Sequence, residues 1–209
     1  MADRMSKTTD MTVGNPIRHI LRFALPLLVG NVFQQLYNMV DSLVVGNFVG
    51  ANALAAVGNC GAVNSLFFAM ANGLSIGIGI LAAQYFGAHN EEKIKSVIGN
   101  AIYALGTVAL IMSVFGILLS PLVIRVLGTP DVLRADSVIY MRVTCAGMLG
   151  IAFYNGTAAV LRALGDARTP LYFLILSSIV NVILDLMFVL QLDMGVLGVG
   201  LATVIAQLI

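Results

Sequence analysis

Charged side chains are scarce in this chain of 209 residues, where they make up 10% of the sequence against 59% hydrophobic residues. The mean hydropathy of +0.98 lies far outside the balance of ordinary soluble domains. The charges nearly cancel, with 11 Lys and Arg against 10 Asp and Glu, and the cations are scattered between apolar blocks. Because a nucleic acid requires a concentrated basic face, the composition indicates a membrane protein and excludes a nucleic-acid partner.

Metal and redox motifs are lacking as well. Cys60 and Cys145 lie far apart in apolar segments, and His89 stands in a polar turn without partners at ligand spacing. We expect the cysteines to be packing residues, and we expect no cofactor and no metal site other than one for Na+. The glycines of "GLSIGIG" favour close helix packing over a phosphate loop, and the "NGT" sequon at Asn155 falls inside an apolar block.

Long apolar blocks fill the chain after a polar opening. A bilayer crossing needs about 20 helical residues, and about six blocks approach or exceed this length. The expected spans are residues 17–45, 53–83, 94–119, 138–161, 171–190 and 194–209. Short turns rich in Gly, Pro, Asn and Asp separate them. The sequence therefore predicts an all-α integral membrane protein, with a tail at residues 1–15 and a six-helix lobe at residues 16–209.

The last expected span has only about 16 residues, which is short for a bilayer crossing. A chain end inside hydrocarbon would leave backbone carbonyls without partners. We therefore expect the sixth helix to be truncated and the chain to be part of a longer protein.

The cations are distributed unequally between alternate turns, and such cations are retained on the cytoplasmic side during insertion. One side carries Arg4, Lys7, Arg18, Arg22, Lys93, Lys95, Arg162 and Arg168. The other side carries only Arg125, Arg134 and Arg142. The asymmetry predicts a multi-pass protein of the cell membrane with its N-terminus in the cytoplasm.

Two acids, Asp41 and Asp185, lie within the apolar blocks. A charge near the middle of the bilayer costs a few kcal/mol, and no Lys or Arg lies at similar depth to neutralise either acid. Asn181 precedes Asp185 by one helical turn, and Thr203 is a lone hydroxyl in the last block. These polar groups could only join helices by hydrogen bonds, a role that Asn or Ser would fill at lower cost. The aspartates therefore favour a functional role.

Further polar side chains extend this pattern, and a proline interrupts it. Gln34, Asn38 and Asp41 recur at helical spacing, with Tyr37 beside them, and Asn155 adds an amide in the fourth block. We regard Gln34, Tyr37, Asn38 and Asn155 as candidates for the lining of a substrate cavity. Pro26 should bend the first helix, either as fixed shape or as a hinge.

Four segments taken in order carry a family resemblance: "QQLYNMVDSLVVGNFVGANALAAVG", "AAQYFGAHN", "RALGDARTP" and "NVILDLMFVLQLDMGVLGVGLATVIAQ". Together they resemble the multidrug and toxic compound extrusion (MATE) transporters. The resemblance implies two lobes of six helices with alternating access, of which this chain would be the N-terminal lobe and would lack its C-terminal partner. It also implies export of cationic or amphipathic small molecules in antiport with Na+ or H+. The positions associated with cation binding are Asp41, Asn181, Asp185 and Thr203.

Two other functions fit part of the pattern. A flippase for lipid-linked or polyprenyl-linked sugars would share the helical plan but would need a cationic cavity for phosphate, which the deep acids disfavour. An intramembrane aspartyl protease also uses two membrane aspartates. Its glycine-flanked signature is missing, because "ALGD" ends at Asp166 in a turn expected to be cytoplasmic. We therefore expect a transporter rather than an enzyme.

Overall fold

The computed structural model describes residues 16–208. The expected tail at residues 1–15 lies outside these residues, as does residue 209. Every element in the described range is helical. The elements are α1 (Pro16–Val44), the π-helical turn η2 (Val45–Val49), α2 (Ala51–Gly87), α3 (Glu91–Val126), α4 (Asp131–Ala146), α5 (Met148–Ala163), α6 (Arg168–Leu186), the π-helical turn η3 (Met187–Gln191) and α7 (Gly195–Gln207).

Several of these helices have the length and composition of membrane spans. In the described part of the chain, three helical segments are long and apolar enough to cross a bilayer: α2, α3 and α6 continued by η3. A fourth is added if α4 and α5 form one bent span. The 29 residues of α1 suffice in length, but its amides lower its hydropathy. With 13 residues, α7 is shorter than a crossing helix.

The fourth expected span differs from the prediction of one helix over residues 138–161. The structure has two helices here: α4 begins at Asp131 and α5 begins at Met148. Their axes meet at an angle of 44° at Gly147. A Cβ atom at Gly147 would lie 2.5 Å from Cγ2 of Val204, so glycine allows α7 to approach the bend. The next backbone bond, from the Ile151 N–H to the Gly147 carbonyl, is 3.3 Å long. Close packing against α7 at a flexible residue therefore accounts for the break.

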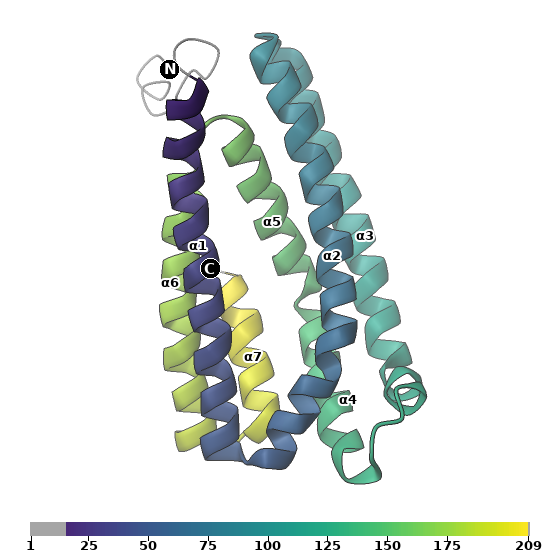
Figure 1. The fold of residues 1–209 in the computed structure, drawn as a ribbon. Coiled ribbons are helices and arrows are strands. Elements are labelled where there is room, and N and C mark those ends of the chain that lie inside the picture. Colours follow the sequence, from purple (N-terminus) through teal and green to yellow (C-terminus); the bar gives the residue numbers. More distant parts are fainter. Residues whose placement is uncertain (1–15, 209) are drawn as a thin grey trace.

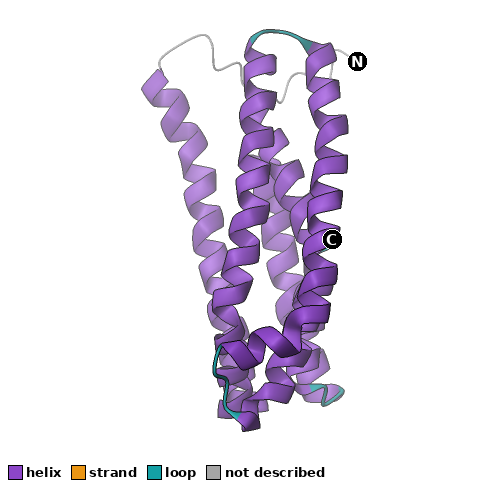
Figure 2. Cartoon of the chain, turned by 90° about the vertical axis from the view of Figure 1, so that its right-hand side faces the viewer, coloured by secondary structure: helices purple, strands orange, loops and turns teal. Residues whose placement is uncertain are grey.

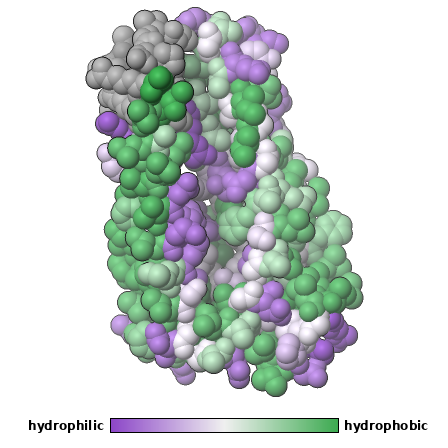
Figure 3. Space-filling view, viewed as in Figure 1, coloured by the Kyte–Doolittle hydropathy of each residue, from purple (hydrophilic) through white to green (hydrophobic). Residues whose placement is uncertain are grey.

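The helices form two groups that α7 connects. α1 packs along α6, whereas α2 packs against α3, α4 and α5. α7 contacts both α4 and α6. Figures 1 and 2 show the long helices running side by side as one elongated bundle. α1 makes few contacts with α2 beyond the turn that joins them. Figure 3 shows a hollow between these two sides, with hydrophilic side chains along its α1 edge.

The outside of the bundle is strongly apolar. Large side chains such as Leu118, Ile76 and Ile183 are about three-fifths exposed or more, at 69%, 61% and 59%. A soluble monomer rarely exposes so much contiguous apolar surface, whereas a bilayer provides an apolar solvent for it. The chain is therefore that of a multi-pass membrane protein.

Candidate functional site

Two polar residues of α6 form the centre of the site. Asn181 and Asp185 lie one helical turn apart on the same face, and each is 0% exposed. The start of α6 is fixed by Asp166, whose carboxylate accepts hydrogen bonds from the N–H groups of Arg168 and Thr169 at 3.0 Å each. This capping satisfies backbone donors that the first turn leaves free. The helix thus begins at a defined residue and holds both side chains toward the interior.

α1 contributes a second pair of residues with the same spacing. Tyr37 and Asp41 are both partly buried. Asp41 and Asp185 lie within electrostatic reach of each other across the contact between α1 and α6. The structure therefore brings together the two acids, which stand 144 residues apart in the sequence.

Thr203 of α7 completes this group. Its hydroxyl donates to the carbonyl of Val199 at 3.0 Å and accepts a hydrogen bond from the Tyr37 hydroxyl at 3.4 Å. The bond from Tyr37 connects α1 to α7 beside the acids. The four cation-binding candidates and Tyr37, a candidate for the cavity lining, thus converge where α1, α6 and α7 meet, and we call Asp41, Asn181, Asp185, Thr203 and Tyr37 the acidic cluster.

The polar atoms at the centre of the acidic cluster lack partners. Within the described residues, no hydrogen bond reaches Oδ1 of Asp41, either carboxylate oxygen of Asp185, or either polar atom of the Asn181 amide. Burial of such groups without compensation costs free energy, and the cost is largest for an ionised carboxylate. None of the Lys and Arg side chains that the structure describes is buried. The arrangement therefore suits a bound proton or small cation that supplies the missing positive charge.

The other candidate residues lie apart from this centre. Gln34 and Asn38 are exposed on α1, and the Asn38 amide bonds to Gln35 at 3.3 Å. Asn155 is partly buried on α5, and no hydrogen bond in the described chain joins it to the acidic cluster. Pro26 lies inside α1, which continues unbroken through it. Whether Gln34, Tyr37, Asn38 and Asn155 line a cavity stays a prediction.

Sequence reasoning missed two features near the acidic cluster. Tyr140 of α4 is 7% exposed and lies within electrostatic reach of Asp41 and Asp185. A tyrosine in an apolar block resembles an ordinary packing residue, so only its hydroxyl could have drawn attention to it. The turns η2 and η3 also follow closely after Asp41 and Asp185. Such π-helical turns are frequent at functional sites, but a sequence pattern does not reveal them.

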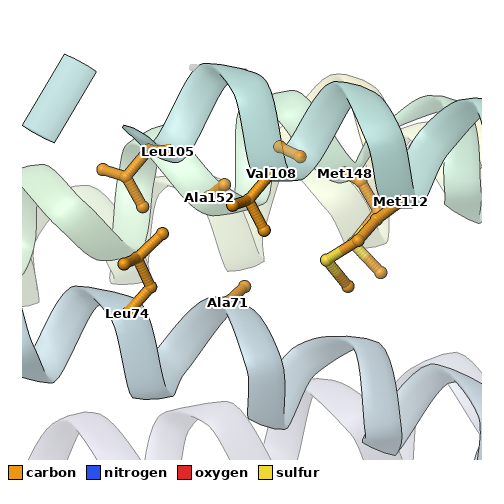
Figure 4. Close-up of a pocket in the computed structure, with 8 residues that line it drawn as sticks. Ala71, Leu74, Leu105, Val108, Met112, Met148 and Ala152 are labelled. Carbon is orange, nitrogen blue, oxygen red and sulfur yellow. The ribbon is translucent and has the colours of Figure 1, made fainter. Parts of the chain in front are cut away.

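An apolar pocket lies elsewhere, between α2, α3 and α5 (Figure 4). Only apolar side chains line it: Ala71, Leu74, Leu105, Val108, Ala109, Met112, Met148 and Ala152. A pocket without polar groups cannot hold an ion, so it is distinct from the acidic cluster.

The chain is similar to proteins of known family. Two relatives from Bacillus subtilis are called probable multidrug resistance proteins. YpnP is 29% identical over 96% of this chain and 45% of its own length, and YoeA is 31% identical over 91% and 42%. A transporter of the MOP superfamily from Pyrococcus furiosus superposes with a TM-score of 0.90 at 29% identity, over 97% of this chain and 45% of that chain. A MATE crystal structure in the bent conformation gives 0.87 at 29% identity, over 93% and 43%.

These matches share one property, which is that the chain spans less than half the length of each relative. This coverage agrees with the expectation of one lobe of a two-lobe transporter. The MatE family profile matches residues 26–187, which is most of the chain and includes Asp41, Asn181 and Asp185. The chain belongs to the MatE family, the multidrug and toxic compound extrusion transporters.

Proposed function

We propose that this chain forms the ion-coupling lobe of a secondary transporter that exports cationic or amphipathic small molecules in antiport with Na+ or H+. The observation that carries the proposal is the acidic cluster, in which a fully buried carboxylate and amide meet a second carboxylate without any cationic partner among the described residues. A structural ion pair would include the cation. An exchange site instead has no fixed cationic side chain, so that a proton or a metal cation can bind there and leave.

The chemistry follows from two carboxylates in a region of low dielectric constant. Ionisation of both Asp41 and Asp185 is costly, so the pair retains a proton or binds a cation. Asn181 supplies a neutral carbonyl oxygen beside them, which suits a hard cation such as Na+. A cationic substrate competes with the ion for the same negative charge. This reciprocal coupling would allow inward movement of the ion to drive outward release of the substrate.

α1 is the element best placed to respond to ion binding. It is held mainly by α6 and η2 and makes few contacts with α2. Neutralisation of Asp41 would change the attraction between α1 and the ion at Asp185. Pro26 removes one backbone hydrogen bond from α1, so we propose that α1 bends there during transport.

We also propose that the N-terminus is cytoplasmic. Figure 1 places the α2–α3 and α5–α6 turns at one end of the bundle and the α3–α4 turn at the other. Lys93 and Lys95 follow the first of these turns, and Arg162 and Arg168 flank the second. This cation-rich end would face the cytoplasm.

The alternatives account for fewer observations. A flippase for lipid-linked sugars would bind phosphate with buried cations, and no described Lys or Arg side chain is buried. A protease would place two aspartates around a scissile peptide. It would leave the role of Asn181 unexplained.

The proposal is tested by replacement of Asp185 with asparagine, which keeps size and hydrogen bonding but removes titration. Asp185→Asn should abolish efflux of a cationic dye from cells that express the protein, while surface expression is retained. Asp193→Asn is the matched control, because Asp193 is exposed outside the cluster and its φ of 49° suits asparagine. Parental efflux by a well-expressed Asp185→Asn protein would refute the proposal.

A further inference from the structure

Arg142 of α4 forms a hydrogen bond to a buried serine on a neighbouring helix. Its side chain is exposed, yet its Nε donates a hydrogen bond to Oγ of Ser120 on α3 at 3.1 Å. Ser120 is 0% exposed, and its own hydroxyl donates to the carbonyl of Ile117 at 2.9 Å. The serine oxygen is therefore fixed, and it holds the inner edge of the guanidinium in one orientation.

The outer edge of this guanidinium has no carboxylate partner in the described chain. Asp131 pairs with Arg134 instead. Asp136 lies six residues before Arg142, which places it on a different side of α4. The helices packed against α4 supply no nearby acid, since α2 and α7 contain none and α3 has only Glu91 and Glu92 at its far end. The terminal N–H donors of Arg142 thus face outward with an uncompensated positive charge.

The depth of the Arg142–Ser120 pair is set by α3. This helix has 36 residues, so it is about 54 Å long and exceeds a hydrocarbon core of about 30 Å. Residues 96–124 form an uncharged, mostly apolar run between Lys95 and Arg125, with a length of about 43 Å that exceeds the thickness of the core. Ser120 lies near the end of this run, five residues before Arg125. The guanidinium, bonded to Ser120, therefore lies toward the end of the span and away from the middle of the bilayer.

The surface around the pair suits acyl chains. Ile139 lies one turn before Arg142 on the same face of α4 and is 40% exposed. On α3, Leu119 directly precedes Ser120 and Leu122 follows it by two residues, and they are 42% and 58% exposed. A cation with exposed apolar side chains on the same two helices, near the end of the span, is complementary to a lipid with an anionic headgroup.

We propose that Arg142 and Ser120 form a binding site for the phosphodiester of an anionic phospholipid, in the leaflet at the α3–α4 end of the bundle. The planar guanidinium presents paired N–H donors that match phosphate oxygens, while Ser120 fixes its orientation. The apolar side chains beside it contact the acyl chains. The site is separate from the acidic cluster and does not depend on the transported substrate.

The test is native mass spectrometry of the full chain with mixed phosphatidylglycerol and phosphatidylcholine. The parent should retain phosphatidylglycerol preferentially. Arg142→Gln should weaken this binding about tenfold, because charge-assisted hydrogen bonds to the phosphate are lost. Arg142→Lys, which keeps the charge but loses the planar donor pair, and Ser120→Ala should each give a smaller loss. Arg125→Gln is the matched control, since Arg125 is an exposed arginine in the last turn of α3, and it should bind as the parent does.

Three results would overturn the proposal. The first is equal phosphatidylglycerol affinity in the parent and Arg142→Gln proteins. If Arg142→Gln does not fold, equal affinity in Arg142→Lys, Ser120→Ala and the parent has the same meaning. The second is an equal loss in Arg125→Gln, which would indicate attraction by total charge alone. The third is Arg142-dependent binding of inorganic phosphate that millimolar phosphate saturates without lipid, which would assign the site to a free anion.

Discussion

At the scale of single residues, the Tyr37–Thr203 hydrogen bond connects α1 to α7 beside the two acids. Thr203→Val keeps the shape of the side chain but removes the acceptor, so the Tyr37 hydroxyl loses its partner. We expect the free energy of unfolding in detergent to fall by about 1 kcal/mol. Thr203→Ser keeps the hydroxyl and should differ less from the parent. Equal stability of the valine and parent proteins would show that this bond contributes nothing.

At the scale of helices, two glycines of α3 differ in how closely neighbouring atoms approach them. A Cβ atom at Gly116 would lie 2.4 Å from Sγ and 3.0 Å from Cβ of Cys145, whereas one at Gly99 would meet nothing within 4 Å. Gly116→Ala should therefore destabilise the contact between α3 and α4 by about 1–3 kcal/mol. Gly99→Ala should be neutral or stabilising, because alanine favours the helix. Thermal unfolding of the two variants measures the difference, and equal melting temperatures would contradict the packing described here.

Some features of the helices and of the acidic cluster could be predicted from the sequence, and others could not. The helical class and the polar faces of α1 and α6 followed from composition and from the spacing of Asp41, Asn181 and Asp185. Hydropathy could not reveal the bend at Gly147, because it depends on the approach of Val204 from α7. The same holds for Tyr140, whose position near the acids is set by tertiary packing. Local pattern predicts which face is polar, whereas contacts between distant segments decide which polar groups meet.

At the scale of the whole molecule, the two ends of the bundle should be on opposite sides of the membrane. In a variant without Cys60 and Cys145, single cysteines can be placed at residues 47–52 and 128–136, or at 90–95 and 163–168. An impermeant thiol reagent applied to intact cells should label cysteines at residues 47–52 and 128–136 and should not label those at 90–95 and 163–168. The native cysteines are 0% exposed, so their replacement leaves the surface unchanged. Labelling of Lys93→Cys in intact cells would reverse the proposed orientation and the direction of export.

The central claim is that the acidic cluster binds the coupling ion in competition with a cationic substrate. Its most direct test is the affinity of the purified protein for a cationic dye, measured as the concentration of H+ or of Na+ is raised. The parent affinity should weaken with one of these ions, and Asp185→Asn should remove that dependence. Asp41→Asn should act similarly, and the double variant should be scarcely different from Asp185→Asn if the two residues share one ion. An Asp185→Asn protein whose dye affinity responds to both ions as the parent does would contradict the account.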